Sequence, residues 1–551
     1  MKTLKIKYII AAITLGIFTS CNILDIDPKD SYTEKGIFSD LALTEAYLTK
    51  HYAFLKAGWG ADWVYADQYS LRFVSDESMC NFNWQGYHNV NNGAMTPDQI
   101  GGINIWSDYY AKIKDINIFF NNLDVLQALD ETSRNTLTGE AHFFRAFYYM
   151  SLVNMYGGVP LITKTLNLND PDLMVPRNSY EECADFVVKE FQKAADLLPE
   201  KQTGENFGRA TKGAALALKS RMLLYMASPL WNTTNDKAKW QQAATAAEEV
   251  MKLGYRLDND YQGLFLNPRS SEIIFQRLYT QEFGTYFDWT NTPNGWGGYS
   301  ATCVLQGMVD SYENEDGTMP NPANYATATS DPWKNRDPRL YASILCDGQT
   351  FRGDVVDFWE NEDGKSGGRS SRFGNEGWNA AKTSYTLRKF MDESLKNAWS
   401  DKSKQPWVFC RLGEIYLNYA EAKYHLGDEA TAREYVNKIR ARARGGKAGI
   451  LPDITETGDA LLKRIQHERK IELAFEDHRF FDVRRWKIAE QTDNMPGKGI
   501  RVVRKPNGDK TYTIITVQPD RKFIVPNHYL LPIPRSEIQK NDKLIQNPGY
   551  K

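Results

Sequence analysis

Three carboxylates repeat at intervals of four residues near the C-terminal end of the chain. Glu468, Glu472 and Glu476 stand in the run IQHERKIELAFEDHRFFDVRRW, whose helical periodicity would place all three on one face. Two carboxylates can cleave a glycosidic bond when they face each other across a cleft. Stacked along one helix, like charges instead repel by about a few tenths of a kcal/mol per pair.

Many arginines lie close to these glutamates in the sequence. They are Arg440, Arg442, Arg444, Arg469, Arg479, Arg484 and Arg485. Because arginine forms geometrically specific ion pairs with carboxylates, we predict that packed arginines neutralise the three glutamates. A glycoside hydrolase is the catalytic alternative. The chain has no GxSxG, HExxH, P-loop or dinucleotide-binding GxGxxG motif, so the sequence predicts a protein that is not an enzyme.

Aromatic side chains in polar, glycine-rich stretches form the second set of candidates. A flat ring can cover the C–H face of a sugar, and one stacked ring contributes about 2–3 kcal/mol before ordering and desolvation costs. The candidates for stacking are Trp84, Tyr87, Trp289, Trp296 and Tyr299, followed by Tyr286 and Trp359, and those for contacts with hydroxyl groups are Arg72, Asn83 and Asp288. Each ring could instead anchor the core of a loop.

These candidates fall in two segments without sustained helical periodicity, residues 58–103 and 255–405. Both segments are rich in Gly, Pro, Asn and Asp, which is typical of turns and long loops. Binding residues concentrate in long loops that a rigid scaffold carries. We therefore expect the two insertions to converge on one face and to form a platform for successive sugar rings.

Amphipathic helical patterns surround the two insertions. They lie near 40–57, 104–128, 132–157, 179–198, 211–228, 236–254, 411–426 and 429–444. The last two are separated only by Gly427 and Asp428, so these helices must lie antiparallel. The sequence predicts a mainly α fold of about four tetratricopeptide-like hairpins, although the spacing departs from the regular repeat of about 34 residues.

Composition excludes some classes of function. The 551 residues carry a net charge of only −2, so no strong field favours nucleic acid. The six cysteines and seven histidines form no zinc-binding pattern. A disulfide between Cys303 and Cys346 is possible, but the sequence does not establish it. Oxygen atoms of Asp258 to Asp260 and of Glu313 to Gly317 could bind a structural calcium ion, but neither segment has the full ligand spacing. No cofactor is predicted.

The N-terminal segment MKTLKIKYIIAAITLGIFTSC has the plan of a secretory signal peptide, with lysines before an apolar run too short to span a bilayer. Cys21 follows the small residues Thr19 and Ser20, as in a lipobox, although Phe18 replaces the usual leucine. We predict a signal peptide over 1–20, lipidation at Cys21, a tether over 21–38 and a single body over 39–551. Plain secretion is the alternative.

Four longer motifs resemble the SusD/RagB family. They are GEAHFFRAFYYMSLVNMYGGVPLI at 139–162, RLGEIYLNYAEA at 411–422, the run around the three glutamates, and YLLPIPRSEIQKNDKLIQNPGY at 529–550. The resemblance covers essentially the whole chain and concerns scaffold rather than ligand contacts.

The resemblance implies an outer-membrane lipoprotein of Bacteroidetes-type bacteria that faces the cell exterior. It further implies that the protein captures oligo- or polysaccharide and acts as a lid on a SusC-like TonB-dependent transporter. Some relatives handle peptides, so a non-glycan nutrient stays an alternative.

The lipid anchor can be tested directly. Cys21→Ala should abolish acylation and leave uncleaved or mislocalised precursor, because the thiol is the proposed attachment point. Metabolic labelling with a fatty acid, followed by membrane fractionation, measures both effects. Label that still enters the Cys21→Ala protein would contradict the prediction.

Overall fold

The computed structural model describes residues 34–59, 69–167, 169–170, 173–327, 331–397 and 399–551. The predicted signal peptide, Cys21 and most of the tether lie outside these residues. Helix α2 (Glu34–Ser39) covers the last tether residues. Phe38 in α2 is buried, and its ring centroid lies 5.9 Å from that of Phe119, so this part of the predicted tether packs on the body.

All eight predicted helices are present. They are α3 (Leu41–Phe54), α5 (Trp106–Asn121), α6 (Glu131–Tyr156), α7 (Tyr180–Leu197), α8 (Lys212–Ala227), α9 (Lys237–Met251), α13 (Leu412–Leu426) and α14 (Glu429–Ala443). Helix α6 packs on α7, α8 on α9 and α13 on α14. The Tyr47 hydroxyl of α3 donates to the carbonyl of Asp115 in α5 at 2.8 Å, which links the first pair. The mainly helical fold with four tetratricopeptide-like hairpins is confirmed.

Local sequence explains the tightest hairpin. Gly427 ends α13 with φ 91°, a left-handed conformation that glycine adopts without steric cost. Asp428 then caps α14, since its side chain accepts a hydrogen bond from the Thr431 amide at 3.1 Å. Helix α7 and α8 also pack together, as do α9 and α13, so the hairpins form one continuous stack.

Short strands that the sequence analysis did not predict join the two insertions. They are β1 (Ser78–Cys80), β3 (Thr302–Val304), β8 (Thr386–Leu387) and β4 (Ile344–Leu345), which form one sheet in the order β1-β3-β8-β4. Strands β1 and β3 are antiparallel, and Cys80 lies opposite Thr302. Strands this short carry no readable alternation of apolar and polar residues.

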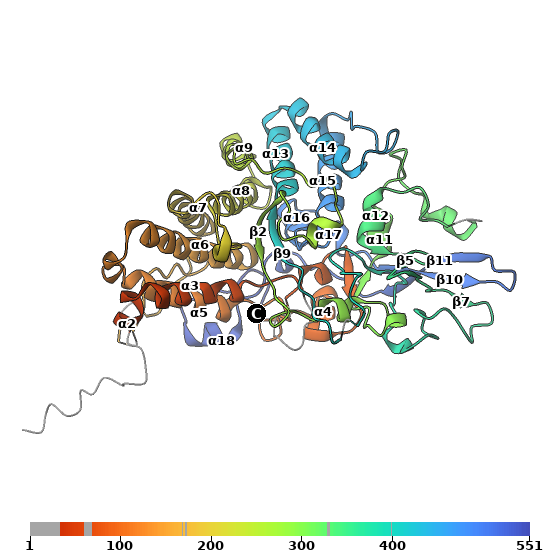
Figure 1. The fold of residues 1–551 in the computed structure, drawn as a ribbon, viewed down its shortest axis with the longest axis horizontal. Coiled ribbons are helices and arrows are strands. Elements are labelled where there is room, and N and C mark those ends of the chain that lie inside the picture. The colour runs from red at the N-terminus through yellow and green to blue at the C-terminus, as the bar shows by residue number, and fades with distance from the viewer. Residues whose placement is uncertain (1–33, 60–68, 168, 171–172, 328–330, 398) are drawn as a thin grey trace, which may run out of the picture.

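Other strands attach the insertion to the rest of the chain. Strand β2 (Ile273–Arg277) pairs with β9 (Trp407–Arg411), which leads directly into α13. Strands β10 (Gly497–Arg504) and β11 (Lys510–Gln518) form a hairpin, and β7 (Glu360–Asn361) pairs with β10 in parallel. The described helices of the insertion are short: α10 (Phe287–Asn291), α11 (Gln306–Val309) and α12 (Pro338–Ser343). Figure 1 shows the helical stack on one side of the molecule and this strand- and loop-rich part on the other.

The charged C-terminal pattern is not one helix. Helix α15 (Gly458–Glu472) ends at Glu472, and α16 (Arg479–Arg485) begins after a turn. Phe475 and Asp477 in this turn both have φ 63°. Glu476 therefore lies in the turn, and the prediction that three glutamates share one helical face is wrong for this residue.

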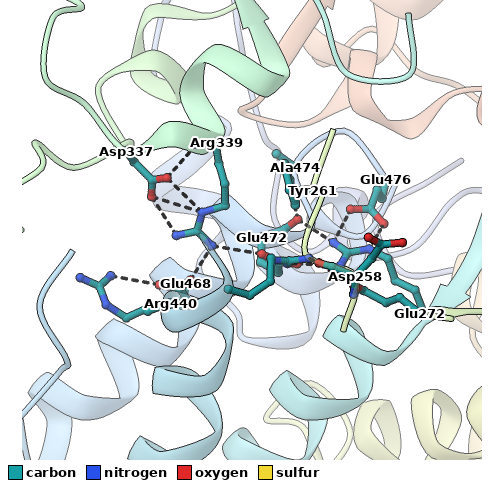
Figure 2. A network of polar contacts seen from close by, with 12 residues as sticks. Asp258, Tyr261, Glu272, Asp337, Arg339, Arg440, Glu468, Glu472, Ala474 and Glu476 are labelled. Carbon is teal, nitrogen blue, oxygen red and sulfur yellow. Dashed lines mark hydrogen bonds and ion pairs between the residues drawn. The ribbon is translucent and has the colours of Figure 1, made fainter. Parts of the chain in front are cut away.

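The three glutamates are nevertheless buried and paired with cations (Figure 2). Glu468 accepts hydrogen bonds from Arg339 at 2.6 Å and from Arg440 at 3.2 Å. Glu472 accepts from Arg339 at 3.1 Å, from Arg411 at 2.6 Å, and from Arg442. The prediction that arginines neutralise these glutamates is confirmed.

Glu476 completes the network through the turn. It accepts from Arg411 Nη2 at 2.7 Å and from Lys389 Nζ at 2.7 Å. Of the arginines singled out in the sequence, only Arg440 and Arg442 pair with the three glutamates. Arg469 instead pairs with Asp482 at 2.8 Å, Arg485 with Glu421 at 2.6 Å, and Arg479 with Asp76 at 2.7 Å.

The network joins the large insertion to the helical stack. Arg339 belongs to α12 within the insertion, whereas Glu468 and Glu472 belong to α15. Burial by itself raises the pKa of Glu472, but Arg442, Arg411 and Arg339 outweigh it and hold that pKa well below its usual range. The carboxylate thus stays ionised inside the protein.

Removing one charge from this network should destabilise the protein. Glu472→Gln should lower the free energy of unfolding by about 3–5 kcal/mol at neutral pH, because three buried arginines lose a shared charged partner and the buried network loses one negative charge. Because the folded pKa is depressed, the contribution is present above the unfolded glutamate pKa of about 4.3 and is lost as the pH falls through the folded value. Denaturant unfolding at several pH values measures both effects.

The matched control is Glu434→Gln. Glu434 pairs with Lys438 at 2.8 Å on an exposed surface, so its loss should cost less than about 1 kcal/mol. Equal effects of the two substitutions would show that the buried network does not stabilise the fold as proposed.

Candidate functional site

Aromatic rings from the two insertions form a contiguous group, which we call the ring cluster. Its members are Phe82, Trp84, Tyr286, Trp289, Tyr299, Trp378 and Trp399. The rings of Phe82 and Trp84 are stacked, with centroids 4.6 Å apart. The Tyr299 ring lies 5.7 Å from Trp84 and 4.7 Å from Trp289. Tyr299 thereby joins the early insertion to the large one.

Two members of the ring cluster project furthest into solvent. Trp378 is 66% exposed, and its ring lies 5.6 Å from Tyr299. Trp399 is 54% exposed and lies 4.4 Å from Trp289 and 5.4 Å from Tyr286. Indoles exposed to this extent leave apolar surface available to a ligand, and their contact with the other rings makes that surface part of a contiguous aromatic group.

Strand pairing and one buried amide hold the cluster together. The antiparallel β1–β3 pair places the chain after Cys80 beside the chain before Thr302. The side-chain amide of Asn81 is buried there and donates to the carbonyl groups of Tyr299 at 3.2 Å, Asn379 at 3.3 Å and Ala380 at 3.1 Å. One side chain thus ties together the segments that carry Trp84, Tyr299 and Trp378.

The glycine-rich stretch before Tyr299 allows a close backbone approach. A Cβ atom on Gly298 would lie only 2.1 Å from the carbonyl oxygen of Thr292, so no larger residue fits. The Ser300 amide donates back to that same carbonyl at 3.1 Å, which closes the loop. This tight loop carries Trp296 and Tyr299.

Three predicted ligand contacts are buried and cannot meet a ligand at this surface. Tyr87 packs edge-on against Phe73 at 5.0 Å. Arg72 donates to the Trp59 carbonyl at 3.2 Å and to Thr302 Oγ1 at 3.2 Å. Both side chains are buried among other parts of the protein, which corrects their assignment as ligand contacts.

Asp288 is the third buried residue. Its carboxyl group accepts hydrogen bonds from Ser403 Oγ at 2.7 Å and from Gln405 Nε2 at 2.7 Å. Burial raises the pKa of Asp288 to about 6, and these hydrogen bonds oppose the rise. Asp288 therefore fixes the segment that carries Trp289 instead of meeting sugar hydroxyls.

Trp296 and Trp359 are not members of the ring cluster, and each contacts an arginine. The guanidinium of Arg369 covers the Trp296 ring at 3.7 Å, and Phe351 meets that ring at 5.3 Å. The guanidinium of Arg504 lies 4.7 Å over Trp359. Arginine thus occupies one face of each indole, and these two rings stay weaker candidates.

Asn83 remains a candidate for hydrogen bonds to a ligand. Its side chain is exposed next to Trp84, and Oδ1 accepts a hydrogen bond from the His88 amide at 3.0 Å. Phe82, Trp378 and Trp399 were not predicted as site residues from the sequence. Both tryptophans stand in polar runs of the large insertion, so the signal that selected Trp289 was present, but no sequence feature distinguishes the loops that reach the ring cluster from the other loops of the insertion.

The carboxylates considered as calcium ligands have hydrogen-bond or ion-pair partners within the protein. Asp258 accepts from Ser270 Oγ at 2.6 Å, and Glu313 pairs with Arg440 at 2.9 Å. Among the described residues, no three or more His, Cys, Asp or Glu side chains gather as metal ligands. Cys303 and Cys346 are both buried free thiols, so the disulfide between them is not formed.

Two family descriptions match this chain. One, the SusD family, matches residues 262–550, and the other, described as starch-binding associating with outer membrane, matches residues 24–224. The chain belongs to the SusD family.

Over the described ranges, no helix has the length and apolar character needed to cross a membrane.

Similar proteins support this membership along the full length. The SusD-like protein P2 of Formosa agariphila is 25% identical over 565 residues and covers 100% of both chains. A SusD-like protein from Bacteroides fragilis, known from its crystal structure, is 30% identical with a TM-score of 0.78, over 95% of this chain and 100% of that one. A laminarin-binding SusD-like protein is 23% identical with a TM-score of 0.66, over 92% of this chain and 99% of that one.

Proposed function

We propose that this SusD-family protein captures an oligo- or polysaccharide at the cell surface and delivers it to a SusC-like TonB-dependent transporter. The observation that carries the proposal is the ring cluster, in which two insertions far apart in sequence supply rings to one site and the large insertion supplies two exposed indoles, Trp378 and Trp399. The starch-binding description of the matched family and the laminarin-binding relative support a glycan as the ligand.

The geometry of the ring cluster suits several weak contacts with sugar rings. Each stacked ring contributes about 2–3 kcal/mol, and the costs of binding reduce two or three such contacts to micromolar or millimolar affinity. The planes of Trp289 and Trp399 are inclined by 58°, and those of Tyr299 and Trp378 by 81°. A glycan that bends between successive sugars fits such inclined rings better than a flat ribbon does.

Two alternatives can be separated by experiment. The ring cluster would also accept apolar side chains of a peptide, so a peptide pool should be screened beside a glycan array. Catalysis on a glycan is disfavoured because Glu468, Glu472 and Glu476 are buried and paired with cations. New reducing ends after incubation of the purified protein with a glycan panel would establish a hydrolase.

Exposed indoles of the ring cluster should control glycan affinity. Trp378→Ala and Trp399→Ala should each lose about 1–3 kcal/mol, or about fivefold to more than a hundredfold in dissociation constant, toward the glycan selected on the array. Isothermal titration calorimetry measures the loss. The melting temperature should change little, because a solvent-facing ring contributes little to the core.

Trp359→Ala is the matched control, since Arg504 covers one face of that indole. It should leave glycan affinity close to that of the unsubstituted protein. Unchanged affinity in both the Trp378 and the Trp399 variants would place the glycan site elsewhere.

Delivery to the transporter predicts a stable membrane complex. Extraction in mild detergent should co-purify the protein with a TonB-dependent β-barrel, and Trp378→Ala should keep this partner while it loses glycan. The helical stack is the proposed docking face because it offers a broad rigid surface. Extraction of the protein only as a free monomer, with the transporter present in the same membranes, would contradict the lid role.

A further inference from the structure

A pocket outside the ring cluster lies between α3, the loop at residues 205–209 and the chain that follows β2. Its volume is about 600 Å³, within the range of small-molecule sites. Four aromatic rings line it, those of Tyr52, Phe207, Tyr279 and Phe283. Because they come from three separate segments, the pocket exists only in the folded protein.

Two large apolar side chains of the same pocket lie open to solvent. Phe283 is 68% exposed, and Leu278 is 37% exposed. Apolar surface that is exposed to water costs free energy in the unliganded protein. An apolar group that covers both side chains removes this cost. The lining therefore favours an apolar occupant.

The two arginines of the lining are already engaged. Arg209 pairs with Glu140 at 2.6 Å and with Glu45 at 3.6 Å. Arg277 donates to the Leu55 carbonyl at 2.8 Å, and its guanidinium lies 4.9 Å from the centre of the Tyr279 ring. An anionic ligand would lose its hydration on entry without gaining a cation of its own.

The Tyr52 hydroxyl group of the lining is also satisfied. Tyr52 donates to Glu140 at 2.7 Å and accepts from the Ala210 amide at 2.6 Å. Gln276 Oε1 is a buried acceptor of the lining without a hydrogen-bond partner among the described residues, but most of the wall is apolar, so an apolar group fits it better than a sugar does. The chemistry of this pocket thus differs from that expected of the ring cluster.

One short segment contributes to both sites. Thr285 lines the pocket, and it exchanges two backbone hydrogen bonds with Ser403, at 2.9 and 2.8 Å. The next residue, Tyr286, belongs to the ring cluster, with its ring 5.4 Å from Trp399. The pocket and the ring cluster are therefore adjacent along the chain at this segment.

We propose that this pocket is a second ligand site and that it takes an uncharged aryl or alkyl group, such as the apolar substituent of a glycoside. The rings and Leu278 supply the apolar contact, and the paired arginines exclude anions. The site does not depend on glycan binding by the ring cluster.

The neutral fluorophore N-phenyl-1-naphthylamine tests the proposal with the full-length protein. Its emission should rise saturably as it enters the pocket. Octyl glucoside below its micelle concentration should displace it, because the octyl chain competes for the same walls, whereas glucose should not. Absence of saturable binding, or displacement by glucose, would overturn the proposal.

Variants at the rim separate this pocket from other apolar surfaces. Leu278→Asp and Phe283→Ala should each weaken fluorophore binding about tenfold, and both positions are exposed enough for the fold to survive. Trp378→Ala, in the ring cluster, should bind the fluorophore unchanged. Fluorophore binding that survives both rim substitutions would overturn the pocket assignment. Intact glycan binding in the rim variants would show that glycan capture, the proposed function, does not depend on this pocket.

Discussion

Buried ion pairs between arginines and glutamates determine how the loop-rich half of this protein sits on its helices. Arg339 reaches from α12 to Glu468 and Glu472 on α15, and Arg411 at the end of β9 reaches Glu472 and Glu476. Removing an ion from water costs several kcal/mol, and only complete pairing offsets that cost. A misplaced insertion would leave these charges buried and unpaired, so the network favours a single position of the insertion on the helices.

The position of the insertion also affects the ring cluster, because the backbone connects the two. Helix α12 runs directly into β4, which belongs to the same four-stranded sheet as β8, β3 and β1. The β1–β3 edge then brings Trp84 beside Tyr299. An ion pair far below the surface thereby contributes to the position of rings that a glycan would touch.

The site has a clear division between exposed and buried side chains. Exposed rings such as Trp378 and Trp399 offer contact area, while buried polar groups such as Arg72, Asn81 and Asp288 hold the loops beneath them. Polar groups that are buried need hydrogen-bond partners, so each of these residues restrains the loops around it. A platform made of long loops can be rigid for this reason.

The sequence by itself was sufficient for the helical scaffold, the family and the pairing of the glutamates with arginines. Amphipathic periodicity and helix caps such as Gly427 and Asp428 are local signals, and all eight predicted helices lie where these signals stand. Only the tertiary structure decided which rings come together in the ring cluster, the candidate site. Tyr87 and Trp84 lie three residues apart in similar surroundings, yet Tyr87 is buried against Phe73 and Trp84 belongs to the ring cluster. That difference depends on strands of two or three residues and on the contacts of Asn81 with segments more than two hundred residues away, which leave no periodic trace in the sequence.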